Sequence, residues 1–353
     1  RQLQDDREFE QAYDRLVIAT GARPAWPSVP GSDLEGILGL RTLESGLAVQ
    51  RFLAERKPKK AVIIGCGYVG IEMAETLRRL GLEVTMVIRS GKVLRATLDE
   101  DMRELVRAEL VRNGVEVVKG TPVSFSGDGR LEAVVTAGGH YPCDLVLLGM
   151  GAKPNVELAQ AAGVALGHSG AIATDASMAS NLPGVFAAGD CAEAYHLVTG
   201  KPAYIPLGST ANKQGRVAGE NAAGGQATFG GVTGTMVVRC FDLAVASTGL
   251  TSAQARAAGF SPRETKIRAK DISHYFPGAA DLHVKLVVNA ENDQLLGGQI
   301  VGVHGVAKRV DILATALYNR MTIDELRELD LSYAPPFAPV WDPVLVAANV
   351  AAK

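Results

Sequence analysis

Three glycines, Gly65, Gly67 and Gly70, form the pattern G-x-G-x-x-G between an apolar run and an amphipathic run. In this context the first glycine makes a tight turn, the second lets the backbone approach a pyrophosphate, and the third lets a helix pack closely on a strand. The start of that helix offers unpaired N–H groups and a positive dipole end to phosphate oxygens. Residues 61–88 therefore predict a strand–helix–strand unit that binds a dinucleotide, with Tyr68 inside its loop.

The end of the second strand of this unit bears on the choice of coenzyme. A carboxylate there would bind the ribose hydroxyls of NADH, whereas an arginine nearby suits the 2′-phosphate of NADPH. The position holds Ile88, followed by Arg89. The sequence therefore favours NADPH, or the use of both NADPH and NADH.

The composition is that of a water-soluble globular enzyme. The chain has 353 residues, 47% of them hydrophobic and 21% charged, and its formal net charge of −2 gives no reason to expect nucleic acid or an anionic membrane as partner. No apolar run approaches the ~20 residues of a membrane span. The four cysteines (Cys66, Cys143, Cys191 and Cys240) lie far apart without metal-ligand spacing. We therefore expect no metal, no disulfide and a cytoplasmic location.

The remaining elements must position this unit within two or three domains. Strands are expected at 13–20, 114–119, 131–137, 144–148 and 184–190, with 126–130 as the turn between the second and third of these. Helices are expected at 43–55, 99–113 and 206–223. From about residue 230 the pattern changes to antiparallel strands at 236–239, 243–248, 265–268, 282–289 and 295–303, with helices at 252–258 and 306–318. This last part predicts an α+β domain.

Three segments in a fixed order carry a family resemblance: ATGA at 19–22, GCGYVG at 65–70 and GVFAAGDCA at 184–192. Their order resembles that of the FAD-dependent pyridine nucleotide–disulfide oxidoreductases. The resemblance implies an α/β fold with two Rossmann-like nucleotide-binding domains, the second inserted in the first, and a C-terminal α+β dimerisation domain. The implied boundaries are 1–58 and 145–229 for the FAD-binding domain, 59–144 for the NAD(P)-binding domain and 230–353 for the dimerisation domain.

Four later segments narrow the resemblance to one group of the family. They are YIPLGSTANKQGRVAGENAAGG (204–225), SHYFPGA (273–279), GVAKRVDILATAL (305–317) and LSYAPPFAPVWDPV (331–344). They resemble the coenzyme A-disulfide reductase, NADH oxidase and persulfide reductase group. Glutathione and lipoamide reductases use a C-terminal His–Glu pair, but here His304 is the last histidine.

This resemblance implies a homodimeric FAD enzyme that passes electrons from NADPH or NADH to a small disulfide or persulfide, coenzyme A disulfide first. One alternative is an NAD(P)H oxidase that reduces oxygen. Another is a nucleotide-binding dimer without activity.

Individual residues are implied by the same resemblance. The FAD contacts would be Ala19, Thr20, Gly21, Gly189, Asp190, Pro206, Leu207, Gly208 and Ala211. The NAD(P)H contacts would be Gly65, Gly67, Tyr68, Gly70, Arg89 and Gly151. Tyr333 and Tyr275 resemble paired tyrosines that replace the histidine base, reach the partner subunit's flavin site and protonate a leaving thiolate.

Simpler interpretations of these and nearby residues stay open. Asp190 also suits a helix N-cap, and Tyr333 also suits a packed loop aromatic. Lys308 and Arg309 suit either a phosphorylated substrate such as coenzyme A or a solvated helix face.

The sequence departs from the family pattern at its beginning. Family members start with their own G-x-G-x-x-G for the ADP half of FAD, followed by a redox cysteine, and neither is present. None of the four cysteines lies where that nucleophile belongs, so we interpret all four as packing residues. The expectation is an incomplete chain that lacks about 100 residues.

Overall fold

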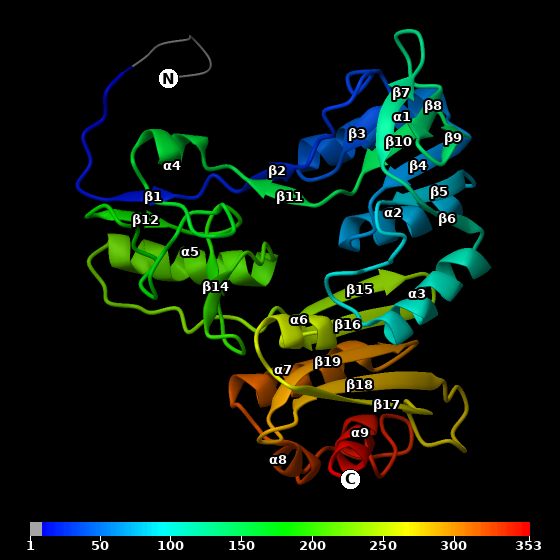
Figure 1. The fold of residues 1–353 in the computed structure, drawn as a ribbon, viewed down its shortest axis with the longest axis vertical. Coiled ribbons are helices and arrows are strands. Elements are labelled where there is room, and N and C mark those ends of the chain that lie inside the picture. Colours follow the sequence, from blue (N-terminus) through cyan, green and yellow to red (C-terminus); the bar gives the residue numbers. More distant parts are fainter. Residues whose placement is uncertain (1–8) are drawn as a thin grey trace. The chain divides into compact units, whose positions relative to one another are not determined.

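A computed structural model describes residues 9–353, so residues 1–8 of the expected first domain lie outside the described residues. The chain divides into two compact units, which we describe separately (Figure 1). Unit 1 contains the residues up to 23 together with 153–196 and 200–232. Unit 2 contains residues 24–152, 197–199 and 233–353.

Unit 1 contains the ATGA and GD segments. Its elements are β1 (Leu16–Ile18), α4 (Glu157–Ala161), β12 (Val185–Ala187), β13 (Ala194–His196), β14 (Lys201–Ala203) and α5 (Gly208–Ala222). β1 and β12 pair in parallel, and β13 and β14 form a hairpin. β1 is shorter than the expected strand over 13–20, since its partner β12 offers three residues to pair with. Because β1 and β12 are parallel, their carboxyl ends meet at one edge.

Unit 2 contains the dinucleotide-binding unit within a parallel sheet of order β3-β10-β4-β5-β6. Its strands are β3 (Ile37–Gly39), β4 (Lys60–Ile64), β5 (Glu83–Ile88), β6 (Val115–Lys119) and β10 (Leu145–Leu148). The helices beside it are α1 (Leu43–Arg56), α2 (Tyr68–Arg79) and α3 (Glu100–Arg112). β3 and β10 lie outside the expected range 59–144, yet β10 pairs with both β3 and β4. The sheet therefore extends beyond the expected boundaries on both sides.

A small antiparallel sheet follows β6 in the chain. It contains β7 (Pro122–Ser126), β8 (Ala133–Thr136) and β9 (Gly139–Pro142). The expected turn at 126–130 is present, but it joins β7 to β8. β6 instead pairs with β5 in the parallel sheet. A separate two-stranded pair consists of β2 (Ala22–Pro24) and β11 (Ala152–Pro154).

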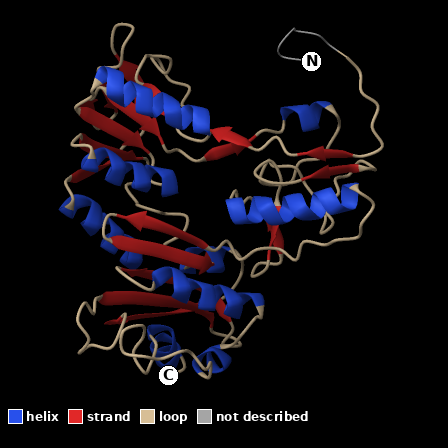
Figure 2. Ribbon diagram, turned by 180° about the vertical axis from the view of Figure 1, so that it is seen from behind, coloured by secondary structure: helices blue, strands red, loops and turns tan. Residues whose placement is uncertain are grey.

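The C-terminal part of unit 2 is an antiparallel sheet of order β15-β16-β19-β18-β17 with four helices (Figure 2). The strands are β15 (Met236–Cys240), β16 (Leu243–Gly249), β17 (Pro262–Lys270), β18 (Asp281–Asn289) and β19 (Leu295–Gly302). The helices are α6 (Ser252–Ala257), α7 (Val306–Tyr318), α8 (Ile323–Arg327) and α9 (Pro343–Ala351). The expected strands and the helices at 252–258 and 306–318 are present, whereas α8 and α9 were not expected.

Both faces of this C-terminal sheet are buried, and each face packs against different elements. Ala246 and Ile300 pack with α7, α8 and α9. Val245 and Val301, their immediate neighbours in sequence, pack in one hydrophobic cluster with residues of the parallel sheet, α2 and α3. Successive side chains of a strand point to opposite faces, so the C-terminal sheet connects the two clusters. The parallel sheet and the C-terminal sheet therefore share a core, which explains why they form one unit.

Candidate functional site

The glycine-rich loop combines two closely packed glycines with one that faces open space. Gly65 follows β4 at φ +99°, and a Cβ added there would lie 2.3 Å from the carbonyl oxygen of Gly149. A Cβ on Gly70 would lie 3.0 Å from the carbonyl oxygen of Gly65. At Gly67, the N-cap of α2, an added Cβ would have no atom within 4 Å, so the space beside the helix start is open. Gly65 and Gly70 thus serve packing, and Gly67 leaves room for a ligand.

A basic loop lies at the end of β5. Ile88 is buried, and the exposed side chains of Arg89 and Arg95 follow it. The amide of Leu94 donates to the carbonyl oxygen of Cys66 at 3.2 Å, which fastens this loop to the glycine-rich loop. Within residues 9–353, neither arginine forms an ion pair with a carboxylate. Arg95 was not among the residues expected from the sequence, and the contact between the two loops joins its neighbour Leu94 to Cys66.

Two more of the expected nicotinamide residues lie near the same sheet edge. Tyr68 is the first residue of α2, and burial raises its pKa to about 12, so the phenol stays protonated at neutral pH. Gly151 follows β10 at φ +95° and is exposed. β10 pairs in parallel with β4, so the carboxyl ends of both strands point to one edge.

In unit 1, the ATGA segment lies directly beyond β1. The amide of Ala188 donates to the carbonyl oxygen of Ile18 at 3.0 Å, so the segment runs beside the end of β12. Thr20 Oγ1 donates to the carbonyl oxygen of Asn155 at 2.6 Å, and Asn155 Nδ2 donates back to the carbonyl oxygen of Thr20 at 2.9 Å. Gly21 follows at φ +66°. Asn155 thus fixes the turn in which Ala19, Thr20 and Gly21 were expected to contact FAD.

The Gly189–Asp190 turn is attached to α5 by a side chain that the sequence did not single out. Gln214 of α5 is fully buried; its Oε1 accepts a hydrogen bond from the amide of Gly189 at 3.0 Å. Its Nε2 donates to the carbonyl oxygen of Glu193 at 2.9 Å. A buried glutamine at a helical position facing a glycine turn is the signal that could have revealed it. Asp190 caps no helix among the described residues, so the N-cap interpretation is wrong.

The start of α5 completes this group of residues. Leu207 is its N-cap, no side chain caps the helix, and Gly208 is exposed. A Cβ on Gly189 would lie 3.6 Å from the Cβ of Ala211, so the glycine turn lies against the first turn of the helix. Pro206 precedes the N-cap and is partly exposed. The structure thus groups the expected FAD residues of unit 1, and their roles stay predictions.

The two tyrosines, 58 positions apart in the sequence, meet in unit 2. A hydrogen bond between their side chains raises the pKa of Tyr333, while a hydrogen bond with Ser273 acts in the opposite direction. The amide of Ser273 donates to the carbonyl oxygen of Pro335 at 3.2 Å, which joins the segments that contain the tyrosines. Tyr275 and Tyr333 are 65% and 48% exposed, so Tyr333 is not a packed loop aromatic.

The four cysteines are free thiols in poor surroundings for a nucleophile. Burial raises the pKa of Cys66 and that of Cys143 to about 12, and burial also raises the pKa of Cys240. The Sγ atom of Cys191 is buried and lies 3.3 Å from the carbonyl oxygen of Ala188. Thiolates attack disulfides, and burial disfavours the thiolates of Cys66, Cys143 and Cys240.

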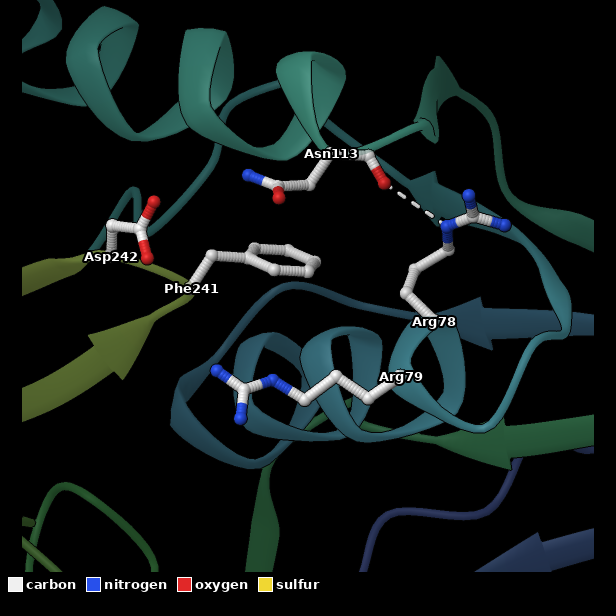
Figure 3. Close-up of a pocket in the computed structure, with 5 residues that line it drawn as sticks. All are labelled: Arg78, Arg79, Asn113, Phe241 and Asp242. Atoms are coloured by element: carbon white, nitrogen blue, oxygen red, sulfur yellow. Dashed lines mark hydrogen bonds between the residues drawn. The ribbon is translucent and has the colours of Figure 1, made fainter.

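A pocket of about 230 Å³ lies elsewhere on unit 2 (Figure 3). Its lining residues are Arg78, Arg79, Asn113, Phe241 and Asp242. Arg78 donates to the carbonyl oxygens of Asn113 and Leu82 at 3.0 and 2.7 Å. The pocket lies at the C-terminal ends of α2 and α3, where the helix dipoles disfavour a phosphate. We therefore assign no coenzyme to it.

Residues 9–353 contain no group of three or more His, Cys, Asp or Glu side chains that could hold a metal ion. The same residues contain no helix with both the length and the apolar character needed to span a membrane.

Comparison with known proteins identifies the family. Residues 1–215 match the family model described as pyridine nucleotide-disulphide oxidoreductase, and residues 236–343 match the dimerisation domain of that family. A relative from Pyrococcus horikoshii, an NAD(P)H coenzyme A polysulfide/persulfide reductase, is 39% identical over 343 residues, which are 97% of this chain and 77% of the relative.

Solved structures of similar proteins also match this chain over nearly all of its length. An NAD-dependent persulfide reductase from A. fulgidus superposes with a TM-score of 0.94 at 42% identity, over 97% of this chain and 64% of the other. An engineered water-forming NADPH oxidase bound to NADPH, a mutant of the Lactobacillus brevis NADH oxidase, has a TM-score of 0.94 at 28% identity, over 99% of this chain and 78% of its own. This chain thus spans less than two thirds of the persulfide reductase.

These matches confirm the expected fold class, two nucleotide-binding regions followed by a dimerisation domain. The chain belongs to the pyridine nucleotide-disulphide oxidoreductase family.

Proposed function

We propose that the protein is a cytoplasmic, homodimeric flavoenzyme that uses NADPH to reduce a small disulfide or persulfide of the coenzyme A type. The observation that carries this proposal is the junction of the Tyr275 and Tyr333 segments, where the amide of Ser273 donates to the carbonyl oxygen of Pro335 at 3.2 Å and both tyrosines are exposed. It offers a phenolic proton donor in a family some of whose members use a histidine base. The match to the dimerisation domain supports the homodimer, and four free cysteines support a reducing compartment.

The residues of unit 1 suit FAD. Gly189, at φ +80°, has no side chain that would obstruct FAD at the turn before Asp190. In this proposal the Asp190 carboxylate accepts a hydrogen bond from a ribityl hydroxyl of FAD. The uncapped start of α5 stabilises negative charge on the ring system. Bound FAD supplies a two-electron relay between NADPH and a thiol–disulfide partner.

Tyr333 serves as the proton donor. Its hydrogen bond with Tyr275 keeps the pKa of Tyr333 above the ordinary value, so Oη carries its proton at neutral pH. The proton passes from this Oη to the sulfur that leaves when a disulfide is cleaved. The attacking cysteine is implied by the family resemblance and is none of Cys66, Cys143, Cys191 and Cys240.

Removal of the Tyr333 hydroxyl tests this role. We expect Tyr333→Phe to lower kcat for coenzyme A disulfide by about 100-fold, the range of a general acid, with KM for NADPH unchanged. Tyr318→Phe is the matched control, because Tyr318 is also exposed but lies at the end of α7. The measurement is NADPH consumption by the native protein with coenzyme A disulfide, with and without oxygen.

The same assay separates the alternatives. Steady oxygen consumption with NADPH alone, unaffected by Tyr333→Phe, would favour the oxidase. Native protein that purifies without flavin colour and consumes no NADPH with either acceptor would favour the inactive dimer.

The preference for NADPH rests on the loop after β5. The engineered NADPH oxidase has five substitutions. Three are consecutive and change an aspartate and the two residues after it to Ala, Arg and Ser. The other two change a proline five residues further on to Arg and a glycine eighteen residues before the aspartate to Ala. In this chain Gly70 lies eighteen positions before Ile88, which is followed by Arg89 and Ser90, and Arg95 comes five positions later. At this spacing the chain has the same Arg, Ser and Arg as the engineered oxidase, at Arg89, Ser90 and Arg95. It has Ile88 where the engineered oxidase has Ala, and it keeps a glycine at Gly70. This agreement supports recognition of a 2′-phosphate.

Removal of both arginines tests the coenzyme preference. We expect Arg89→Ala with Arg95→Ala to lower kcat/KM for NADPH by about 10- to 100-fold, since hydrogen bonds to charged groups contribute about 1.5–3 kcal/mol. The value for NADH should change less than about threefold. Lys92→Ala is the control, because Lys92 lies in the same loop but faces Glu100 at 3.7 Å. An equal loss for both coenzymes would exclude 2′-phosphate recognition.

A further inference from the structure

Arg309 lies in the first turns of α7 and is 2% exposed. Its Nε donates to Asp342 Oδ2 at 2.9 Å, and the ion pair is buried on both sides. The side chain is therefore neither a ligand for a phosphorylated substrate nor part of a solvated helix face, the two interpretations that the sequence left open. Its neighbour Lys308 is exposed and donates to Ser332 Oγ at 3.3 Å.

The guanidinium of Arg309 contacts the beginning of one tyrosine segment and the end of the other. Nη2 donates to the carbonyl oxygen of Asp271 at 2.6 Å, where the Tyr275 segment (271–280) begins. Nε binds the carboxylate of Asp342, where the Tyr333 segment (329–342) ends.

Each acidic partner in turn fixes its own segment. Asp271 Oδ1 accepts the amides of Ile272 and Ala280 at 2.9 and 2.8 Å, which closes the Tyr275 segment into a loop. Asp342 Oδ1 accepts the amide of Val344 at 2.9 Å and caps α9. Asp271 and Asp342 are buried, at 1% and 4% exposure. Together with Arg309 they form a frame, as we call these three residues, that is closed to solvent.

The shape of the arginine side chain suits this arrangement. The planar fork of a guanidinium directs several donors along fixed directions, whereas a lysine ammonium is one compact centre. Here three nitrogens are used, because Nη1 also faces the carbonyl oxygen of Gly305 at 3.4 Å. A Cβ on Gly305 would lie 2.2 Å from this Nη1, so the helix start leaves space for the guanidinium.

We propose that Arg309 is a positioning residue that holds segments 271–280 and 329–342 together and thereby fixes the surroundings of Tyr275 and Tyr333. This inference rests on the proposed function for the role of the tyrosines in turnover, but the positioning itself is independent of it. The conservative replacement Arg309→Lys keeps the charge beside Asp342 and loses the simultaneous contact with Asp271.

The test reads the tyrosine pair directly in the native protein. The chain has eight tyrosines, so tyrosine labelled with ¹³C at Cζ, with Tyr333→Phe and Tyr275→Phe for assignment, gives the titration of Tyr333 by NMR. In the parent protein Tyr333 should titrate above the ordinary pKa of about 10. In Arg309→Lys the pKa should return toward that value, and in Lys308→Ala, the matched control, it should not change.

Kinetics provide a second readout. Arg309→Lys should lower kcat for the disulfide by about tenfold or more, less than Tyr333→Phe does, with KM for NADPH unchanged. A folded Arg309→Lys variant with an unaltered Tyr333 titration would overturn the proposal. If Arg309→Lys does not fold, Asp342→Asn serves instead, because asparagine still caps α9 while the ion pair is lost; an unaltered titration in that variant would also overturn it.

The two proposals fail in different ways. If Arg309→Lys shifts the titration but Tyr333→Phe leaves turnover unchanged, the positioning stands and the proton-donor role is wrong. If Tyr333→Phe lowers turnover but neither frame variant moves the titration, the proton-donor role stands and the positioning is wrong.

Discussion

Gly65→Ala should prevent unit 2 from folding at 37 °C, whereas Gly67→Ala, two residues away, should leave the fold intact and weaken coenzyme binding. At Gly65 the backbone has φ +99°, and the new methyl group would lie 2.3 Å from the carbonyl oxygen of Gly149 and 2.7 Å from its carbonyl carbon. Strained backbone costs about 1–3 kcal/mol, and overpacking against rigid backbone adds about 1–3 kcal/mol. A loss of about 3–5 kcal/mol is a large part of the stability of a domain.

At Gly67 the same methyl group meets no atom within 4 Å, and φ is −88°. The loss in stability should stay within about 1 kcal/mol, since alanine is a poorer N-cap than glycine. The methyl group instead occupies the space that a pyrophosphate needs. We expect KM for NADPH to rise at least about tenfold, which corresponds to about 1.4 kcal/mol.

Thermal unfolding and NADPH titration of both variants check this pair of results. Gly81→Ala is the control for backbone strain alone, because Gly81 has φ +87° but open space around its Cβ. Gly67→Ala with an unchanged KM would remove the glycine-rich loop from the coenzyme site.

Lys285→Met should destabilise unit 2 by about 3 kcal/mol at pH 7 and by much less near pH 3. Lys285 of β18 has a side chain only 5% exposed, and its Nζ lies 2.8 Å from Asp101 and 2.7 Å from Glu264. Asp99 is a third carboxylate, at 3.5 Å, and it also accepts a hydrogen bond from Gln299 Nε2 at 2.7 Å. Loss of the cation leaves these acids partly buried, with only Lys266 facing Asp101 at 3.4 Å and Arg256 facing Glu264 at 2.7 Å.

The pH dependence follows from the direction of each pKa shift. Burial alone would raise the pKa of Asp101 and of Glu264, but Lys285, together with Lys266 at Asp101 and with Arg256 and Ser252 at Glu264, outweighs burial and lowers both pKa values. A lowered folded pKa contributes stability above the unfolded pKa of about 4, and this contribution is lost as the pH falls through the folded value.

In Lys285→Met, burial is opposed only by the remaining partners, so the folded pKa values of Asp101 and Glu264 should lie higher than in the parent. The variant therefore gains less stability than the parent as the pH rises through these values. The difference between parent and variant should accordingly grow between about pH 3 and pH 7, which urea unfolding at a series of pH values measures.

A neighbouring lysine provides the control. Lys266→Met removes a cation that also faces Asp101, at 3.4 Å, but its side chain is 32% exposed. Exposed pairs contribute about 0–1 kcal/mol, so this variant should be nearly as stable as the parent. A pH-independent loss in Lys285→Met would show that the lysine acts through packing alone.

The strand–helix–strand unit of residues 61–88 could be predicted because its signals are local. The turn at Gly65, the helix start at Gly67 and the close packing at Gly70 each depend on the residue type at that position and on a few neighbours in sequence. The same holds for the alternating strands of the C-terminal sheet, whose two-residue period is visible in the chain. The domain limits were predicted less well, because β3 and β10 join the parallel sheet of unit 2 by pairing with strands that are distant in sequence.

The sequence by itself determined the Rossmann-like strand–helix–strand unit and the family order that its motifs follow. Tertiary structure alone decided which side chains hold the expected site residues in place: Gln214, which accepts from the amide of Gly189, and Arg309, which contacts both tyrosine segments. Neither of these has a local signature, because glutamine and arginine suit an exposed helix or loop equally well. Each acquires its role from a buried partner or a loop contact brought close by packing, and the energy of such a contact depends on burial and geometry that no window of sequence contains.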